Sequence, residues 1–506
     1  MKITRRSALG MLAAAPALRR AAAQTPTFDI HKGPFVGTRE SLKGYTVPEW
    51  FRDAKFGIWA HWGPQSAPEQ GDWYARNMYI EGNPQYQWHK QNFGPQSKVG
   101  FKDVIPTFKG EKFDPEHLLD LYKKAGAKYF MSMGVHHDNF DMWNSKHTRW
   151  NAVNMGPKKD VVGLFRQAAL KHGLKFAVSE HLWISYKWFG TSHDSDKTGE
   201  YAGVAYDGTD PTNFDLYHDL PKNYPQQFSW DDVGIPASWK QHWFDRIKDL
   251  VDNYQPDLLY TDGALPFEEY GLNLVAHLYN SNAARHGGKV EAVYTSKRKE
   301  DCEQGTCALD YERGVADGIS PNPWQTDTCI GQWHYKRDIV YKTPKTVIDM
   351  LVDIVSRNGN LMLNFPLPGS GELDSRELAI LAEITAWMAV NSEGIYGTRP
   401  WKIYGEGPAT AQKGQGRFNE NGRKALSPQD IRFTTQGKTL FAFVMGWPGA
   451  QAAVPSLTNA AGKIENVELL GRKGKLKFTQ DANGLKVDLP GEKPSDHAVT
   501  LKIAMA

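Results

Sequence analysis

Cysteine is the scarcest chemically informative residue of this chain. There are three, Cys302, Cys307 and Cys329, among 506 residues. Their spacing matches no zinc-binding pattern, so the cysteines do not indicate a structural zinc module. One disulfide is possible, most simply between Cys302 and Cys307, which would leave the third thiol free. A cysteine nucleophile has no better support than a metal site.

Long apolar runs and an excess of one charge sign are also missing. No run is long enough to span a membrane, so we expect no membrane insertion. Lysine and arginine together number 60, aspartate and glutamate 57, and the formal net charge is +3. This balance shows no basic bias of the kind that nucleic acid or anionic lipid requires, so neither is expected as a partner.

The first 24 residues are predicted to be a cleaved export signal. Lys2, Arg5 and Arg6 precede an apolar run, and three alanines at 21–23 are typical of a signal-peptidase site. The arginine pair suggests export of the twin-arginine type. The segment holds five basic residues and no acid, so its removal takes the net charge from +3 to −2. We expect an exported, periplasmic or secreted protein, with an uncleaved tail as the alternative.

A short stretch at 256–263 carries a candidate nucleophile. Three consecutive apolar residues, Leu258 to Tyr260, predict a strand that is covered on both faces. Asp262 follows the run, and Gly263 allows the chain to turn sharply. The carboxyl ends of the strands carry the chemistry in α/β barrels, so Asp262 is placed where a nucleophile is expected. A carboxylate that caps the following loop is the alternative.

Strand patterns alternate with helix patterns along residues 25–400. Strands are predicted at 55–63, 128–135, 174–179, 256–262, 290–295, 308–311, 325–330 and 360–365. Helices are predicted at 115–125, 160–172, 237–254, 272–285, 345–358 and 375–392. This number of units favours an α/β fold with an irregular (β/α)8-like, TIM-type barrel over an open sheet. No glycine-rich dinucleotide loop follows the first strand, and no cofactor is expected.

After about residue 400 the apolar period changes to two. Short strands separated by glycine, asparagine, aspartate and proline are predicted at 431–434, 439–444, 467–470, 476–479, 485–488 and 498–503. They predict a small antiparallel β-sandwich without a catalytic constellation. The chain is thus divided into the export signal (1–24), a catalytic barrel (25–400) and the β-sandwich (401–506), in keeping with the usual upper size of one core.

Polar side chains gather at the predicted strand ends. They are His61, His136, His137, Glu180, His181, Asp262 and Glu312. Convergence on one pocket is the economical interpretation. His136 and His137 are adjacent, so in a regular strand one of them would be a packed histidine. A zinc site is the rival interpretation, but the sequence lacks an i, i+4 histidine pair and adjacent histidines chelate one ion poorly, so no metal is assigned.

Several long motifs resemble one known family. Segments 55–79, 127–154 and 156–160, the strand before Asp262, and segments 355–366 and 391–400 are similar, in this order, to glycoside hydrolase family 29, the retaining α-L-fucosidases. The resemblance spans most of the region from 50 to 401. It implies a (β/α)8-like barrel followed by a β-sandwich and a nucleophile at Asp262. By the same matching, the residues that hold fucose are His61, Trp73, His136 and His137.

The chain departs from the family at three places. Asp72 stands where many members have glutamate, and Glu180 and His181 replace an aromatic pair. The acid/base is the family's most variable position, so we expect it at Glu312, with Glu303 and Glu291 as alternatives. For Glu180 the preferred interpretation is an interior carboxylate paired with Lys175 or His181 instead of a catalytic group. The complete set of expected substrate contacts is His61, Asp72, Trp73, His136, His137, Glu180, His181, Arg298 and Trp324.

The chemistry of retention explains these residue types. One ionised carboxylate attacks the anomeric carbon and one protonated carboxyl, about 5–5.5 Å away, protonates the leaving oxygen. Hydrogen bonds should keep Asp262 charged, while an apolar or anionic surround should raise the pKa of Glu312. Imidazoles both donate to and accept from hydroxyls, and indoles cover sugar C–H faces. The expected contributors are Trp59, Trp73, Trp143 and Trp324.

The expected function is exo-acting, retaining α-L-fucosidase activity on fucosylated oligosaccharides or glycoconjugates. A secreted, lectin-like fucose-binding protein and a metal-dependent hydrolase are the alternatives. Residues 183–239 form a connection far longer than the usual ~2–6 residues and are rich in aromatics. We expect this loop to fold over the mouth of the pocket and to influence which linkage is cut. A loop that only covers the side of the barrel is the alternative.

Overall fold

The computed structural model describes residues 26–222, 224–225, 227–303, 305–411 and 418–506. The predicted export signal, residues 1–24, lies outside the described residues. None of the helices that the structure describes combines the length and the apolar character that crossing a membrane requires.

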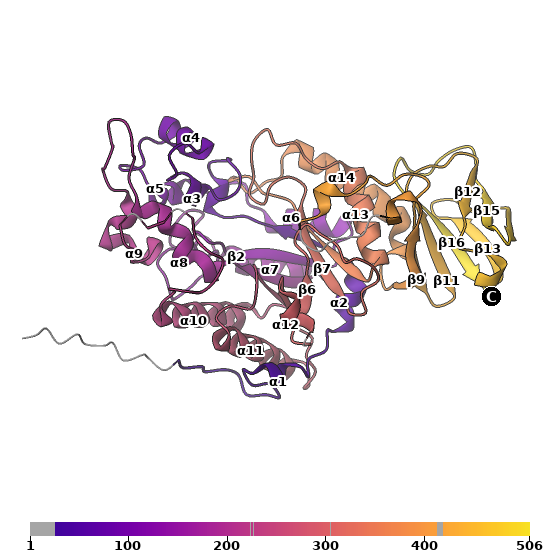
Figure 1. Ribbon diagram of the computed structural model, residues 1–506, viewed down its shortest axis with the longest axis horizontal. Coiled ribbons are helices and arrows are strands. Elements are labelled where there is room, and N and C mark those ends of the chain that lie inside the picture. The colour runs from indigo at the N-terminus through magenta and orange to yellow at the C-terminus, as the bar shows by residue number, and fades with distance from the viewer. Residues whose placement is uncertain (1–25, 223, 226, 304, 412–417) are drawn as a thin grey trace, which may run out of the picture.

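Eight parallel strands close into a barrel in the order β1 to β8, and β8 pairs with β1. Figure 1 shows this part of the chain beside the strands that lead to the C-terminus. The strands are β1 (Phe56–Ala60), β2 (Tyr129–Val135), β3 (Lys175–Glu180), β4 (Leu258–Thr261), β5 (Val293–Ser296), β6 (Ala308–Asp310), β7 (Trp324–Cys329) and β8 (Gly359–Asn364). Each was predicted from its apolar run to within a few residues. The α/β fold class and the TIM-type barrel are therefore confirmed.

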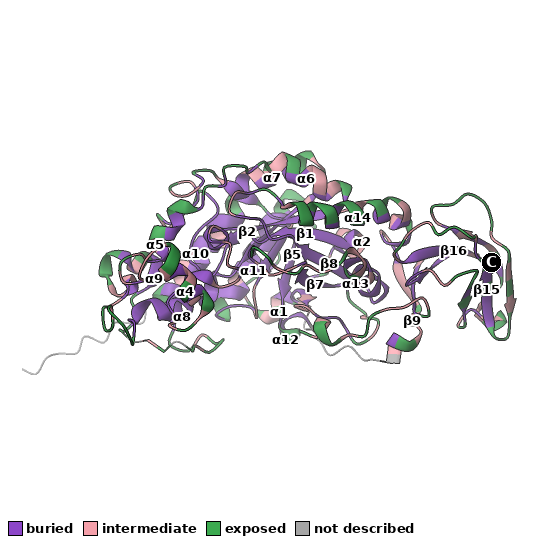
Figure 2. Cartoon of the chain, turned by 90° about the horizontal axis from the view of Figure 1, so that it is seen from above, coloured by how far each residue is buried: buried purple, intermediate pink, exposed green. Residues whose placement is uncertain are grey.

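Helices surround the barrel, as Figure 2 shows by their exposed outer and buried inner faces. The longer helices are α6 (Pro115–Lys124), α7 (Val161–Lys171), α10 (Ala237–Tyr254), α11 (Glu269–Arg285), α13 (Pro344–Ser356) and α14 (Ser375–Asn391). The shorter ones are α1 (Arg39–Leu42), α2 (Glu49–Ala54), α3 (Tyr74–Asn77), α4 (Pro84–Asn92), α5 (Phe101–Val104), α8 (Ser185–Trp188), α9 (Phe214–Tyr217) and α12 (Lys299–Glu303). Local caps start several of them: Asp114 accepts from the His117 N–H at the start of α6, and Asp374 and Glu377 form a capping box on α14.

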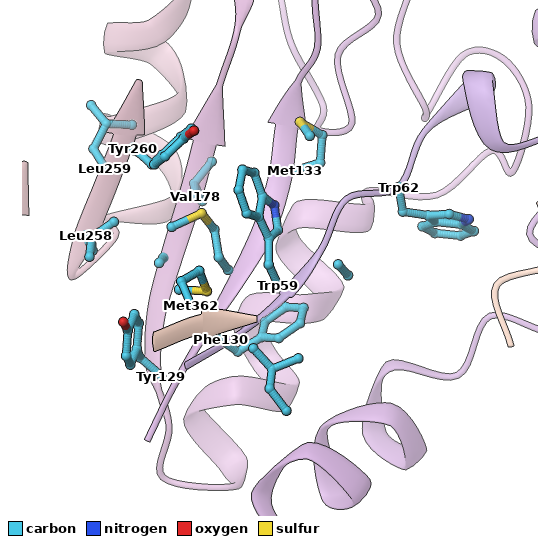
Figure 3. Packing of buried hydrophobic residues seen from close by; sticks show 14 of the residues in the cluster. Trp59, Trp62, Tyr129, Phe130, Met133, Val178, Leu258, Leu259, Tyr260 and Met362 are labelled. Carbon is cyan, nitrogen blue, oxygen red and sulfur yellow. The ribbon is translucent and has the colours of Figure 1, made fainter. Parts of the chain in front are cut away.

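The interior of the barrel is filled, so it leaves no channel through the molecule. Trp59, Tyr129, Leu258 and Met362 are among the buried residues of this core (Figure 3). The Tyr129 ring crosses over Gly57 on the neighbouring strand, where a Cβ would come within 2.5 Å of it. Bulky side chains therefore fill the lower barrel, and the cavity that holds Asp262 opens at the carboxyl ends of the strands.

The chain continues into two antiparallel sheets. One has the order β13-β16-β11-β10-β9 and the other β12-β15-β14. Their strands are β9 (Arg399–Glu406), β10 (Ile431–Gln436), β11 (Thr439–Val444), β12 (Gln451–Val454), β13 (Ile464–Leu469), β14 (Phe478–Asp481), β15 (Gly484–Asp488) and β16 (Val499–Met505). The predicted β-sandwich is confirmed. The sequence did not indicate β9, an edge strand containing Pro400 with no fully buried residue, or the short β12.

A buried charge cluster joins the barrel to the β-sandwich. Asp353 of α13 binds the guanidinium groups of Arg357, at 3.1 Å, and of Arg423 and Arg432, which lie on the β-sandwich side. Burial alone would raise the pKa of Asp353, but the three cations outweigh it and lower the pKa well below its usual range. The carboxylate therefore stays charged and ties the two parts together.

Cys302 and Cys307 form a disulfide in the connection between β5 and β6, the pairing that the sequence left possible. Cys329 is free and buried, and burial raises the pKa of its thiol to about 12. A thiol that is protonated at neutral pH is a poor nucleophile, so Cys329 is a packed residue.

Candidate active site

The open space at the carboxyl ends of the barrel strands is a cavity of about 860 Å³. This volume is within the usual range of small-molecule sites, ~300–1,000 Å³. Of the predicted site residues, its lining includes His61, Trp73, His136, His137, His181, Asp262, Arg298 and Glu312. They follow β1 to β6 at or just past the strand ends. The convergence expected from the sequence is thus present in the fold.

Lys297, directly after β5, is the residue on which the carboxylates of the cavity meet. Its Nζ lies 2.7 Å from Asp262 Oδ1, 2.7 Å from Glu312 Oε2 and 3.3 Å from Asp327 Oδ2. The side chain is only 2% exposed. Because both contacts are to one nitrogen, Asp262 Oδ1 and Glu312 Oε2 can be no more than 5.4 Å apart, twice 2.7 Å. That bound matches the spacing used for retention and is shorter than the ~6.5–9.5 Å used for inversion.

Asp262 is held as a carboxylate. Its Oδ2 lies 3.5 Å from His137 Nε2 and 3.4 Å from His181 Nδ1, while Lys297 holds Oδ1. Burial would raise the pKa of Asp262, but the Lys297 charge and the contacts with His137 and His181 lower it well below its usual range. The group is therefore charged at neutral pH and able to act as a nucleophile.

Glu312 has the opposite tendency. Burial raises its pKa, and the negative charges of Asp327 and Asp262 raise it further, although Lys297 partly counters them. Two carboxyls close to one another with pKa values displaced in opposite directions are the arrangement that separates a proton donor from a nucleophile. The pair can therefore perform acid-assisted displacement at a carbon placed between them.

A second pair of carboxyls, those of Asp327 and Asp310, lies deeper in the barrel than Lys297. Tyr260 donates to Asp327 Oδ2 at 2.8 Å, and Gln325 Nε2 donates to Asp310 Oδ2 at 2.5 Å. Burial and the charge of Asp327 raise the pKa of Asp310 well above its usual range, so Asp310 is neutral. Asp327 thus supplies a charge that anchors Lys297 from below, and the lysine in turn fixes the two carboxyls above it.

Neutral imidazoles also line the cavity. Burial lowers the pKa of His61 and His136 well below 6.5, and lowers that of His181 to about 4. The predicted conflict between His136 and His137 does not arise, because β2 ends at Val135 and both rings line the cavity. Neutral rings can donate one hydrogen bond and accept another, which suits vicinal hydroxyl groups.

The same rings are the residues that could hold a transition metal. Two buried groups have ligand atoms within 4.8 Å of one another, namely His61 with His136 and His334, and His136 with His137 and His181. Imidazole suits zinc, copper and nickel. The first group includes a histidine, His334, that the sequence did not indicate.

The structure contradicts two of the predicted tryptophan contacts, Trp324 and Trp143. Trp324 opens β7, so it lies at the amino end of the barrel, where its indole donates to the Arg357 carbonyl at 3.0 Å. It lines a different cavity from Asp262. Trp143 donates to Asp249 at 3.2 Å and is buried beneath α10. Neither indole is among the described residues that line the Asp262 cavity.

Glu180 and Asp72 are also displaced from the cavity lining. Glu180 is fully buried, accepts from the Leu182 N–H at 2.9 Å and the Trp243 indole at 3.1 Å, and has a pKa raised by burial to about 7. It is the interior carboxylate of the alternative interpretation, but with partners other than those named, since Lys175 binds Asp257.

Asp72 accepts from two backbone N–H groups of the cavity wall. These belong to Trp333, at 3.2 Å, and His334, at 2.7 Å. Asn364 accepts from the His61 N–H at 2.8 Å and donates to the Trp333 carbonyl at 2.9 Å. The shorter carboxylate noted in the sequence thus positions the Trp333–His334 wall instead of pointing into the cavity.

Of the acid/base alternatives, Glu291 precedes β5 at the amino end of the barrel and pairs with Lys289 at 2.5 Å. It is on the wrong side of the barrel to reach Asp262. Glu303 is the last residue of α12, and its side chain lies outside what the structure describes. Glu312 is the alternative that the structure brings to Lys297.

Several cavity residues were missed. Lys297 had a usable signal, since it follows a predicted strand just as Asp262 does. Asp327 and Tyr260 lie inside predicted strands, and the sequence does not show which side chains of such a strand point into the barrel. Trp333 and Phe418 lie in irregular segments without a local signal.

The long connection after β3 folds as a compact loop that carries α8 and α9. Trp183 and Trp230 line the cavity. Other aromatics of the loop pack internally: Tyr206 is buried and donates to Asp196, and Tyr217 is buried and donates to Asp207. Only part of the aromatic content predicted to cover the mouth therefore reaches it.

The chain matches two family models, "Alpha-L-fucosidase" over residues 23–393 and "Alpha-L-fucosidase C-terminal domain" over residues 425–504. It is 27% identical to the tissue alpha-L-fucosidase of Homo sapiens over 483 residues, covering 92% of this chain and 90% of that protein. It is 26% identical to the plasma alpha-L-fucosidase of Homo sapiens, covering 90% and 88%.

Solved structures have the same fold. The alpha-fucosidase of Thermotoga maritima in complex with fucose superposes with a TM-score of 0.71 at 24% identity, over 92% of this chain and 99% of that chain. Isoenzyme 1 of the alpha-L-fucosidase from Paenibacillus thiaminolyticus gives 0.65 at 20% identity, over 92% and 99%. With the first family model matching well over half of its length, the chain belongs to the alpha-L-fucosidase family.

Proposed function

We propose that the protein is an exo-acting, retaining α-L-fucosidase that removes terminal α-L-fucose from oligosaccharides or glycoconjugates. The observation that carries this proposal is the pair Asp262 and Glu312 held at one lysine, with oxygens no more than 5.4 Å apart, twice 2.7 Å. Family membership supports the hydrolase class, and this spacing supports double displacement.

In the first step Asp262 attacks the anomeric carbon and Glu312 gives its proton to the glycosidic oxygen. We assign the attack to Oδ2, because Lys297 occupies Oδ1. The products of this step are the departed alcohol and a fucosyl ester of Asp262. In the second step Glu312, now a carboxylate, takes a proton from water as the water attacks the same carbon, which releases fucose with its configuration retained.

The buried rings give the sugar its orientation. His61, His136 and His137 are proposed to bond the fucose hydroxyls, with His181 beside the nucleophile. Trp73 and Trp333 offer indole faces to the apolar side of the ring and to its methyl group. Arg298, half exposed on the rim, contacts the substrate farther from the scissile bond.

Export from the cytoplasm is part of the proposal. The disulfide between Cys302 and Cys307 is of a kind that persists in oxidising compartments. It agrees with the basic and apolar pattern of residues 1–24, which predicts a periplasmic or secreted protein.

Proton NMR of the first product formed from an aryl α-L-fucoside tests the mechanism. We expect α-L-fucose to appear first and the β-anomer only as it mutarotates. First appearance of the β-anomer would contradict retention. Binding of fucose without turnover would favour the lectin-like alternative, and loss of turnover on addition of a chelator would favour the metal-dependent one.

Replacing Lys297 with glutamine should move both limbs of the pH profile of kcat/KM to higher pH. The lysine charge lowers the pKa of Asp262 and counters the raised pKa of Glu312. Without it the pKa values of both carboxyls rise. Asp262 then becomes charged only at higher pH, which moves the acid limb up, and Glu312 keeps its proton to higher pH, which moves the alkaline limb up.

Lys297→Arg is the matched control, since it keeps the charge and should leave both limbs near their original positions. Thermal unfolding of each variant shows whether the carboxyl cluster still folds. Limbs that stay in place in a folded Lys297→Gln protein would contradict the electrostatic role.

Replacing Trp230 with alanine should change the ranking of natural fucosylated oligosaccharides while activity on a small aryl fucoside falls little. The indole is 52% exposed, lines the cavity and packs on Trp73 with ring centroids 5.8 Å apart. It therefore lies where the sugar beyond fucose leaves the pocket. Tyr201→Ala, in the same loop but outside the cavity lining, is the control. Proportional loss on every substrate would indicate a structural role for the loop.

A further inference from the structure

Phe418 is an exposed aromatic residue beside the proposed proton donor. It lies more than a hundred residues after Glu312, beyond the barrel and β9, yet it lines the cavity and is 61% exposed. Among the exposed large hydrophobic side chains of the described residues, only Phe418 and Trp230 are aromatic, and both line this cavity. Trp230 comes from the loop after β3, so two distant segments each place one accessible ring at the same mouth.

Backbone contacts fix Phe418 against the β6 strand end. Its N–H donates to the Glu312 carbonyl at 2.8 Å, and the Glu420 N–H donates to the Arg313 carbonyl at 3.0 Å. These two bonds run the segment alongside the residue that carries the proposed proton donor. The position of the Phe418 ring relative to Glu312 is therefore set by main-chain geometry.

The segment is also anchored by a buried carboxylate. Glu420 is 7% exposed and accepts from Thr328 Oγ1 at 2.7 Å and Lys342 Nζ at 3.1 Å, with Arg313 at 3.5 Å. Phe418 itself has a φ of 56°, in the left-handed region that a bulky residue adopts only at an energetic cost. The Phe418 ring is exposed, its backbone conformation is unfavourable, and the buried Glu420 anchors the segment. Together these features indicate that the ring contacts a ligand.

The proposed role of Glu312, which gives its proton to the glycosidic oxygen, identifies that ligand. A group that protonates the glycosidic oxygen must lie against the bond between fucose and the sugar that departs. A residue hydrogen-bonded to the backbone of Glu312 and exposed at the mouth therefore faces the departing sugar and not fucose. The flat phenyl face is suited to the C–H face of a pyranose.

We propose that Phe418 forms the binding surface for the leaving sugar, a pyranose that stacks its C–H face on the ring. This inference rests on the proposed function and deepens it. The connection between β9 and β10 of the β-sandwich thereby takes part in substrate selection, in addition to joining two strands of one sheet.

The test compares two substrates that differ only in the leaving group. α-L-Fucosyl fluoride releases a single atom and cannot touch the ring, whereas a fucosylated disaccharide places galactose there. For Phe418→Ala we expect kcat/KM on the disaccharide to fall by about tenfold, the size of a stacking contact, and kcat/KM on the fluoride to change by less than about twofold. Phe418→Trp, which keeps a flat face, should restore the disaccharide value.

The ratio of two products, which does not depend on the amount of folded enzyme, gives a second readout. With fucosyl fluoride as donor and galactose as added acceptor, Phe418→Ala should lower fucosyl transfer to galactose relative to transfer to water. Val340→Ala, which removes an exposed side chain away from the cavity, should leave this ratio unchanged.

Equal loss on both substrates, or no loss on the disaccharide, would overturn the inference. These outcomes differ from failure of the proposed function, in which the wild-type protein would hydrolyse neither substrate.

Discussion

Asp262→Gly should reduce turnover of an aryl α-L-fucoside by roughly three to five orders of magnitude, the scale on which removal of a nucleophile acts. The fold should survive. Asp262 lies just past β4 instead of inside the packed barrel, and Lys297 keeps Glu312 and Asp327 as partners. Added azide should restore part of the rate by occupying the vacated space and should yield β-L-fucosyl azide, because only one displacement then takes place.

Asp257→Ala is the matched control for this variant. Asp257 precedes β4 at the opposite end of the barrel, where it binds Lys175 at 2.9 Å. Its loss should lower thermal stability and leave kcat near the wild-type value. Wild-type turnover in folded Asp262→Gly protein would remove Asp262 from the mechanism.

Glu312→Ala should have the second largest effect, and the effect should depend on the leaving group. For fucosides with a poor leaving group we expect kcat/KM to fall by about 10²–10⁴-fold, the usual contribution of a general acid. Activated dinitrophenyl fucosides need little protonation and should lose far less at the first step. The alkaline limb of the pH profile should disappear, because that limb reports loss of the Glu312 proton.

Glu300→Ala provides the comparison for Glu312, since Glu300 lies on the same rim, is 67% exposed and makes no contact of 4 Å or less with Lys297 among the described ion pairs. Its profile should keep both limbs. Equal loss on good and poor leaving groups in Glu312→Ala would direct the assignment to Glu303.

The sequence predicted those parts of the site that depend on short-range pattern. Each barrel strand is a buried apolar run, and the residue after such a run lies at the active end of a parallel barrel. This pattern predicts from the sequence that Asp262, Glu312 and the histidines lie around one cavity.

Long-range contacts could not be predicted in this way. The bridging position of Lys297 depends on how β4, β5 and β6 align, and Phe418 reaches the cavity from the connection between β9 and β10, which has no local sequence pattern. Trp324 was a different kind of error. It stands before the predicted run 325–330, so it should have been placed at the amino end, away from the chemistry. The role of Asp72 depends on a backbone wall 261 residues away.

The disulfide between Cys302 and Cys307 has a thermodynamic consequence for the connection between β5 and β6. Lys297, Arg298 and Glu300 line the cavity, and the loop that the bond closes begins two residues after Glu300. In the chain-entropy account a loop of this length removes about 2 kcal/mol of disorder from the unfolded chain. Part of the free energy of unfolding of the barrel therefore depends on whether the surroundings keep this bond oxidised.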